Sequence, residues 1–198
     1  AQEPFFSLIL SQTTHEPFDM PFNEGVENDV EKYINTVRYV DSILGIWYEN
    51  CKKEAWFENT LIIISSDHGH GYPDNYWYTD KERYHIPFIL LGGALKEEFK
   101  GEINNQLCNQ TDIALSLGKQ FELKDQNFEF SKDIMNPYSP KFSSFIHING
   151  HNWVKYENDC SIDFNLEQHF DKEDQSAGKC ELENAAYIQT VFTRYMAY

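Results

Sequence analysis

The sequence is poor in basic residues, and this scarcity argues against several classes of partner. The 198 residues include 16 Lys and Arg against 32 Asp and Glu, a formal net charge of −16. Proteins that bind nucleic acids or anionic membrane surfaces use Lys and Arg to neutralise phosphates. We therefore expect no nucleic-acid partner and no anionic membrane surface. An anionic ester remains compatible with this charge if a metal ion supplies local positive charge.

Long apolar runs and paired cysteine motifs are also absent. No run of about 18 apolar residues occurs, so no membrane span is predicted. The cysteines form no Cys-x-x-Cys pair, which argues against a zinc ribbon or a thioredoxin motif. Cys160 and Cys180 are the nearest pair, and both a disulfide and free thiols remain open for them.

Common catalytic signatures are missing. The chain has no serine-hydrolase elbow, Walker loop or dinucleotide fingerprint. Thr13 and Thr14 carry hydroxyl groups, but no strand-to-helix turn follows that would activate either one. We therefore assign no catalytic nucleophile within this chain.

Alternating strand-like and helix-like segments predict an α/β fold. Apolar runs predict buried strands at residues 5–10, 61–64 and 86–91, and the second suits a central parallel strand. Apolar residues recur at helical spacing between residues 28 and 53, which predicts a long amphipathic helix. A short helix is expected from Thr111 to Leu117.

The C-terminal part predicts an antiparallel addition to this fold. Alternating apolar residues on both sides of Asn149-Gly150 predict a β-hairpin between residues 141 and 156. Residues 159–179 are acidic and loop-like, and residues 183–198 fit an amphipathic helix. The expected architecture is thus a layered α/β sheet with helices on both faces, a C-terminal hairpin and a helix.

Polar residues follow the predicted strands, where α/β proteins gather their ligands. Asp67-His68-Gly69 comes directly after the 61–64 run, and carboxylate and imidazole groups are good ligands for zinc or manganese. Gly69 and Gly71 would allow the backbone to turn and aim both side chains at one ion. The alternative is that Asp67 caps a turn and His68 faces solvent.

Other histidines are weaker candidates when each is taken alone. His15 lies in the loop after the first run, and His85 precedes the 86–91 run. A surface role for His15 and a structural role for His85 are the alternatives. His70 is expected to face solvent, and three histidines of the C-terminal part are expected to be structural: His147, His151 and His169.

Five segments in order resemble the second half of the catalytic domain of the alkaline-phosphatase superfamily. They are similar to the branch that contains sulfatases, lipoteichoic acid synthases and phosphoethanolamine transferases. The resemblance extends over roughly residues 4–117 and is carried by these segments: Pro4–Phe18, Tyr33–Asp41, Asn59–Gly69, His85–Phe88 and Gln110–Ile113.

This resemblance implies roles for the candidate residues. Asp67 and His68 match the paired metal ligands, with Zn, Mn or Mg as the ion. His15 matches the histidine near the transferred phosphate or sulfate group. His85 matches a histidine of the phosphoethanolamine-transferase-like branch, which lipoteichoic acid synthases generally lack.

The resemblance also implies that the catalytic residues are distributed over a longer protein. The family nucleophile and first acidic ligand lie upstream of the segment that begins at Pro4, so the expected partner is a missing N-terminal half of the domain. Residues 1–130 would be the second half of the catalytic domain, and residues 131–198 a hairpin and helix subdomain. The intact enzyme would be membrane-anchored, with an extracytoplasmic catalytic domain. This chain alone is expected to be inactive and to bind metal poorly.

Three readings of the function remain open on the sequence. The first is a transferase or hydrolase of phosphate or sulfate esters. The second is a true sulfatase or phosphodiesterase, which would differ in its upstream nucleophile. The third is a binding or sensing module that kept the fold and lost the chemistry. The aromatic segment from Tyr72 to Tyr84 could contact a glycan or lipid headgroup, or pack as a lid.

Overall fold

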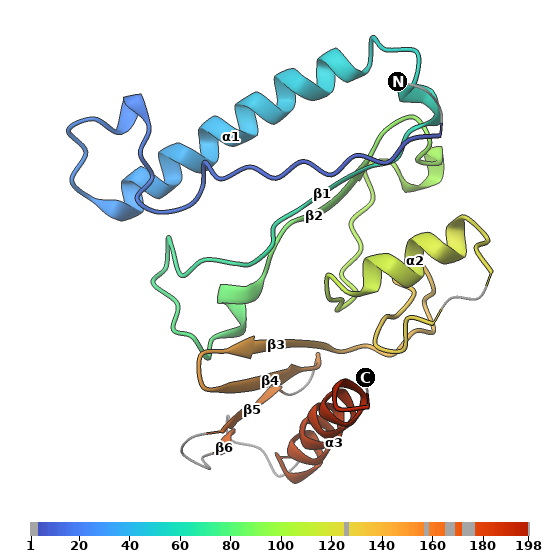
Figure 1. Cartoon of the computed structure of the whole chain (residues 1–198). Coiled ribbons are helices and arrows are strands. Elements are labelled where there is room, and N and C mark those ends of the chain that lie inside the picture. The colour runs from blue at the N-terminus through green and yellow to red at the C-terminus, as the bar shows by residue number, and fades with distance from the viewer. Residues whose placement is uncertain (1–3, 125–126, 157–158, 165–168, 172–176, 198) are drawn as a thin grey trace. The chain divides into compact units, whose positions relative to one another are not determined.

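The computed structural model describes residues 4–124, 127–156, 159–164, 169–171 and 177–197. These residues form an α/β fold with antiparallel sheets and helices (Figure 1). The helices and strands are α1 (Asp29–Cys51), β1 (Ile62–Ser65), β2 (Phe88–Leu91), α2 (Asp112–Gln120), β3 (Ser143–His147), β4 (Gly150–Val154), β5 (Asp159–Asp163), β6 (His169–Asp171) and α3 (Ala177–Tyr195). Short 3-10 helices lie at Pro21–Asn23, Phe57–Asn59, Lys81–Tyr84 and Glu97–Phe99.

The chain divides into two compact units. The first contains residues 1–76 and 85–102, and the second contains residues 77–84 and 103–198. The domain boundary expected at residue 130 falls inside the second unit and stays a prediction. No helix within the described ranges is both long enough and apolar enough to cross a membrane.

Helix α1 confirms the long amphipathic helix expected between residues 28 and 53. Asn28 caps its N-terminus, where the side-chain oxygen accepts a hydrogen bond from the Glu31 amide at 3.1 Å. Asp29 and Glu31 in the first turn place negative charge at the positive end of the helix dipole. The C-terminal turn buries Cys51 in the core of the first unit.

That core holds β1 in place. Cys51, Phe57 and Ile62 are its buried residues, and Tyr48 and Leu91 are among those packed around them. Strand β1 pairs with β2 in antiparallel register, so the expected parallel arrangement is wrong. Residues 66–87 contain no α-helix, and a parallel connection normally needs such a crossover.

The N-terminal apolar segment also differs from expectation. Residues 5–10 form no strand, and the side chains of Phe6 and Leu10 are 87% and 79% exposed. Figure 1 shows this part of the chain as a plain trace. Phe5 alone has a described aromatic contact here, an edge-on approach to Trp56 with ring centroids 5.9 Å apart. Residues 5–10 are largely apolar, but burial depends on a partner that the described residues do not provide.

The second unit contains a four-stranded antiparallel sheet in the order β3-β4-β5-β6. The expected hairpin is confirmed as β3 and β4, and the pairing of His147 with Gly150 puts Ile148 and Asn149 in its turn. The expectation of a loop over residues 159–179 is wrong, because β5 and β6 lie within it. Helix α3 begins at Ala177, earlier than expected, and packs on β4 and β5.

A disulfide and an aromatic stack stabilise this unit. Cys160 of β5 and Cys180 of α3 are bonded, which settles the alternative left open for them, whereas Cys51 and Cys108 are free. The rings of Phe142 and Trp153 stack with centroids 4.2 Å apart. Helix α2 runs to Gln120, three residues beyond the predicted end.

Candidate metal and substrate site

Asp67 and His68 lie in a tight turn directly after β1. The hydroxyl of Ser66 donates to the His68 carbonyl at 2.7 Å, and Asp67 Oδ1 accepts from the His68 amide at 3.0 Å. These local bonds fix the backbone where the strand ends. Both Asp67 and His68 are exposed side chains, so an ion or ligand can reach them.

The orientation of the two side chains fits metal ligation. Asp67 Oδ2 and His68 Nε2 lie 3.9 Å apart. His68 Nδ1 lies 2.8 Å from the Gly69 carbonyl, and since a carbonyl only accepts, Nδ1 carries the proton. The neutral ring then has its lone pair on Nε2, the arrangement that second-shell carbonyls impose on metal-binding histidines. Bonds of about 2.0–2.2 Å from each atom would let both reach one zinc ion.

One oxygen of Asp67 also serves the alternative role considered from the sequence, as a cap of the turn. Oδ1 accepts from the His68 amide, while Oδ2 faces the imidazole. The two roles therefore coexist in one carboxylate.

The pair is an incomplete ligand set. Within the ranges that the structure describes, no three His, Cys, Asp or Glu side chains gather into a group that could hold a metal ion. Zinc sites use three or four protein ligands. The donor chemistry of Asp67 and His68 fits a divalent ion, and zinc sites in proteins add one or two further ligands to such a pair.

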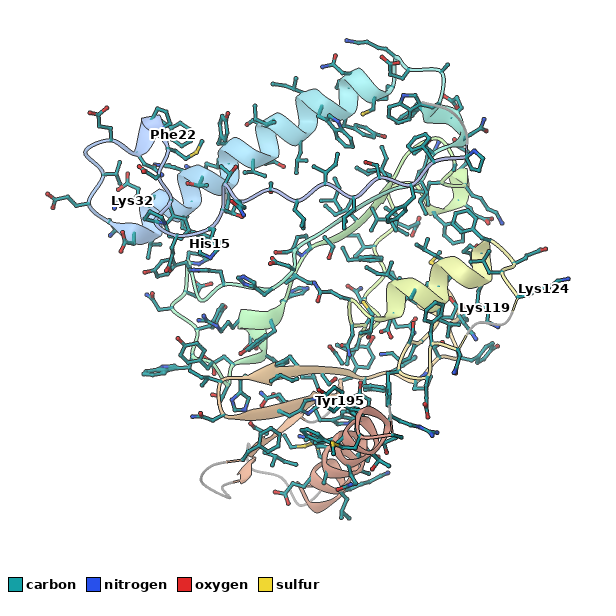
Figure 2. The ribbon with its side chains drawn as sticks, in the orientation of Figure 1. His15, Phe22, Lys32, Lys119, Lys124 and Tyr195 are labelled. Atoms are coloured by element: carbon teal, nitrogen blue, oxygen red, sulfur yellow. A yellow bond between two sulfur atoms is a disulfide. The ribbon has the colours of Figure 1, made fainter. Side chains whose placement is uncertain are left out.

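His15 lies in a loop that borders a hollow. The loop follows the N-terminal trace, and Figure 2 labels His15 there. His15 Nδ1 donates to the Glu16 carbonyl at 2.7 Å, which leaves Nε2 as the atom available to a ligand. The hollow has a volume of about 580 Å³ and is lined by Gln12, Thr13, His15, Glu16, Pro17, Asp19 and Met20.

Buried Asn23 ties this loop to α1. Its side-chain amide donates to the carbonyls of Phe18 and Lys32, at 2.9 and 3.2 Å, and to the Thr36 hydroxyl at 3.2 Å. Thr36 is fully buried on α1, and its hydroxyl in turn donates to the Lys32 carbonyl at 2.8 Å. The helix therefore fixes the end of the loop that contains Phe18.

His85 is exposed at the start of the segment that leads into β2. The preceding 3-10 helix, Lys81–Tyr84, belongs to the second unit, where Tyr84 stacks on Phe145 with ring centroids 3.8 Å apart. The substrate-binding role of His85 stays a prediction.

The aromatic segment before His85 is attached to the sheet of the second unit. Asn152 donates to the Thr79 carbonyl at 2.8 Å, and Lys81 lies 3.4 Å from Asp159. Trp77 is nevertheless 76% exposed. Arg83 lies over the ring of Tyr78, 4.5 Å from its centroid. The segment is therefore held on one side while an indole ring faces solvent.

His70 is more enclosed than expected, with its side chain only 23% exposed. Its ring stacks on Tyr33 with centroids 4.8 Å apart and meets Phe18 edge-on at 5.9 Å. His70 Nδ1 accepts from the Tyr72 amide at 3.0 Å, and Nε2 lies 3.4 Å from Glu16 Oε1. Glu16 is the residue next to His15. Phe18 and Tyr33 come from two segments far from His70 in the sequence, so no local pattern could have identified this environment.

His147 and His151 are packed within the sheet, as expected for structural histidines. His147 Nε2 lies 3.1 Å from the Ser161 hydroxyl, and His151 Nδ1 lies 2.6 Å from Asn184 Oδ1. Both imidazoles are buried. The side chain of His169 lies outside the described ones.

Comparisons with known proteins show which family this sequence matches. The family model of sulfatases matches residues 1–123. Lipoteichoic acid synthase of Staphylococcus aureus, in strains that include USA300 and NCTC 8325, is 29% identical over 134 residues, which cover 57% of this chain and 20% of that protein.

A solved structure supports the same fold. A protein in the alkaline phosphatase superfamily from Vibrio parahaemolyticus matches with a TM-score of 0.73 and 18% identity, over 98% of this chain and 50% of that one. At that identity the likeness establishes the fold, which is the one predicted from the sequence. The chain thus spans a fifth of the length of the curated relatives and half of the structural neighbour.

Proposed function

This chain belongs to the sulfatase family, and we propose that it supplies one half of a metal-dependent site that transfers or hydrolyses phosphate or sulfate esters. The observation that carries the proposal is the geometry of Asp67 and His68, whose ligand atoms lie 3.9 Å apart on a turn fixed at the end of β1. The similarity to lipoteichoic acid synthase favours the phosphotransferase reading over a true sulfatase.

Asp67 and His68 would hold a divalent ion, with Zn, Mn or Mg as candidates. When bound, such an ion lowers the pKa of a coordinated nucleophile and neutralises charge on the ester. The Gly69 carbonyl supports this role, since it keeps the proton on His68 Nδ1 and the lone pair on Nε2. The remaining ligands and the nucleophile would come from another part of the full-length enzyme.

His15 would bind the transferred group through Nε2. Because its Nδ1 already donates to the Glu16 carbonyl, Nε2 can donate to an ester oxygen only when the ring is a charged imidazolium. A cationic ring beside an anionic ester stabilises negative charge that shifts onto the non-bridging oxygens in the transition state. His85 would make a second contact with the substrate.

The longer enzyme implied by the family would be membrane-anchored with its catalytic domain outside the cytoplasm. Lipoteichoic acid synthase of Staphylococcus aureus is among the relatives, and the chain covers only a fifth of its length. Regions not represented in this chain would provide the anchor. Localisation of epitope-tagged full-length protein, with and without extracellular protease, tests this part of the proposal.

Substitution of the metal pair in the full-length enzyme tests the central claim. We expect His68→Ala and Asp67→Ala to lower turnover of bis(p-nitrophenyl) phosphate by several orders of magnitude and to reduce bound zinc and manganese. Asp74→Ala is the matched control, because Asp74 is an exposed carboxylate in a nearby loop. A loss of less than tenfold in His68→Ala would contradict metal ligation at this residue.

The choice of substrate distinguishes the remaining readings. Turnover of p-nitrophenyl sulfate in preference to the phosphodiester would favour the true sulfatase. Metal binding without turnover of either ester would favour the binding module. The 198-residue chain alone should bind zinc at least about 100-fold more weakly than the full-length enzyme and hydrolyse neither ester, because two ligands hold zinc weakly.

A further inference from the structure

A polar side-chain contact joins the two loops that contain the candidate site residues. Glu16 follows His15, and His70 lies two residues after His68. Glu16 Oε1 and His70 Nε2 lie 3.4 Å apart, although the two residues are 54 positions apart in the sequence. The contact therefore links the loop with the predicted substrate histidine to the turn with the predicted metal ligands.

Each nitrogen of the His70 ring already faces a partner. Nδ1 accepts from the Tyr72 amide at 3.0 Å, so the proton of a neutral ring resides on Nε2, the atom that faces Glu16. The ring plane is fixed by the stack on Tyr33, with an interplanar angle of 21°. With both nitrogens engaged, His70 is poorly suited to ligate a metal.

Phe18 fixes the opposite side of the same cluster. It is almost fully buried and adopts a left-handed backbone with φ of 58°, which a bulky residue keeps only where its surroundings compel it. Its ring contacts Tyr33, His70 and Tyr72. The loop therefore enters this cluster at Phe18, and the Glu16 contact fixes the section between Phe18 and His15.

We propose that His70 is a positioning residue, which acts through Glu16 to hold His15 at its working distance from Asp67 and His68. The inference rests on the proposed function of those three residues. His70 does not touch the substrate or the metal. Its effect is geometric, and displacement of a catalytic group by about 1 Å can cost about 100-fold in rate.

Amide hydrogen exchange in the 198-residue chain gives a test that needs no activity. His70→Phe keeps an aromatic ring on Tyr33 but removes the contact with Glu16. We expect faster exchange at the His15 and Phe18 amides, which donate to the carbonyls of Gln12 and His15. Exchange in β1 and β2 should be unchanged, which shows that the first unit stays folded. Tyr33→Phe is the matched control, since it alters the same cluster and leaves the Glu16 contact intact.

Glu16 provides a second variant with little risk to folding, because its side chain is 64% exposed. Glu16→Ala should accelerate exchange at the same two amides as His70→Phe. Glu16→Gln keeps the chain length and an acceptor oxygen and should restore slow exchange. Unchanged exchange in both Glu16→Ala and His70→Phe would overturn the proposal, whatever the activity of the protein proves to be.

Kinetics of the full-length enzyme give the functional readout. Glu16→Ala and His70→Phe should each lower kcat by about 10- to 100-fold, with KM for bis(p-nitrophenyl) phosphate and zinc affinity both changed by less than about threefold. The double variant should be no slower than the slower single variant, because both changes break the same contact. Additive losses, or a large loss of zinc affinity in His70→Phe, would contradict a positioning role.

These outcomes separate failure of the inference from failure of the proposed function. If the wild-type enzyme binds no metal and turns over neither ester, the proposed function fails, while the exchange experiment still decides whether Glu16 and His70 couple the two loops. If the enzyme is active and the exchange rates do not respond, only the positioning role fails.

Discussion

Among the side chains that the structure describes in the second unit, the carboxylate of Asp112 is the most deeply buried charged group. Its side chain is 1% exposed, and Oδ2 lies 3.1 Å from the ammonium group of Lys132, which is 8% exposed. Asp112 also accepts hydrogen bonds from two backbone amides, those of Asn109 and Lys132, at 2.7 and 2.8 Å. One residue at the start of α2 thus fixes the segments on both sides of the helix.

Removal of this carboxylate should be severely destabilising. Asp112→Ala leaves a buried ammonium group without its counter-ion, and we expect a loss of roughly 3–5 kcal/mol in the free energy of unfolding. Denaturant unfolding followed by circular dichroism measures it. The control is Glu129→Ala, which removes the exposed pair with Arg194 and should cost at most about 1 kcal/mol. Similar costs for the two variants would contradict this account.

The imidazole of His151 makes the stability of the second unit depend on pH. Burial lowers the pKa of His151 below its ordinary value of 6.5, the hydrogen bond with Asn184 opposes this effect, and His147 adds a smaller lowering influence. The unfolded chain then binds the proton more readily than the folded protein. Stability from this group is therefore fully present above about pH 6.5 and is lost as the pH falls.

We expect the free energy of unfolding to decrease between pH 7.5 and pH 5.5, and His151→Gln to show a smaller decrease. Glu183 does not interfere, since its hydrogen bond with Lys155 lowers a carboxyl pKa that already lies below this window. Chemical denaturation at a series of pH values gives the slope. An equal slope in wild type and His151→Gln would show that other groups cause the dependence.

At the scale of elements, two glycines differ in whether their position has room for a side chain. Gly92 follows β2 with φ of 104°, and a Cβ atom there would lie 2.1 Å from the Thr60 carbonyl oxygen. Gly45 lies within α1, and a Cβ atom there would meet nothing within 4 Å. The first glycine permits the close approach of two segments, and the second only weakens the helix.

Alanine substitutions at the two glycines should therefore have opposite signs. Gly45→Ala should stabilise the first unit by about 1 kcal/mol through helix propensity, whereas Gly92→Ala should destabilise it by roughly 1–3 kcal/mol through backbone strain and steric overlap. Thermal unfolding of each variant measures the difference. Destabilisation by Gly45→Ala would indicate that a partner packs closely on that face of α1.

Elements with a strong local signal were predicted well. The helical period and the Asn28 cap define α1, and the alternation around Asn149-Gly150 defines the β3-β4 hairpin. Elements whose identity depends on a partner were not. Strand β5 has an acidic composition that resembles a loop, yet it pairs along its whole length with β4. Residues 5–10 have the composition of a strand and no described neighbour to pair with.

At the scale of the whole molecule, the net charge is −16, so the excess carboxylates repel one another in the folded state. Added salt screens this repulsion, as the Debye length falls from about 30 Å at 0.01 M to about 8 Å at 0.15 M. We expect Tm at pH 7.5 to rise over this range, with a gain of about 1 kcal/mol corresponding to about 2–4 °C for a chain of this size. Differential scanning calorimetry at the two salt concentrations measures it.

The control is the same comparison of Tm at two salt concentrations, made at a pH near the isoelectric point of about 4.7. With the net charge close to zero, salt should leave Tm almost unchanged. An equal rise at both pH values would point to a specific ion effect in place of charge screening.

The sequence by itself determined the fold class, the family and the identity of the candidate ligands. An apolar run followed by Asp67-His68-Gly69 is a local pattern, and five such segments in order specify the sulfatase family even though each is weak alone. These features can be predicted from the sequence because they depend on neighbouring residues and on the order of the segments.

Only the tertiary structure decided how the loops are held. The lone pair of His68 is directed by a local carbonyl, but the place of His70 depends on Phe18, Tyr33 and Tyr72, which three different segments bring to one point. The contact with Glu16 spans 54 positions. Contacts between residues far apart in the chain leave no periodic pattern in the sequence. Only the structure therefore shows that His70, expected to be at the surface, packs against the aromatic cluster beside the site.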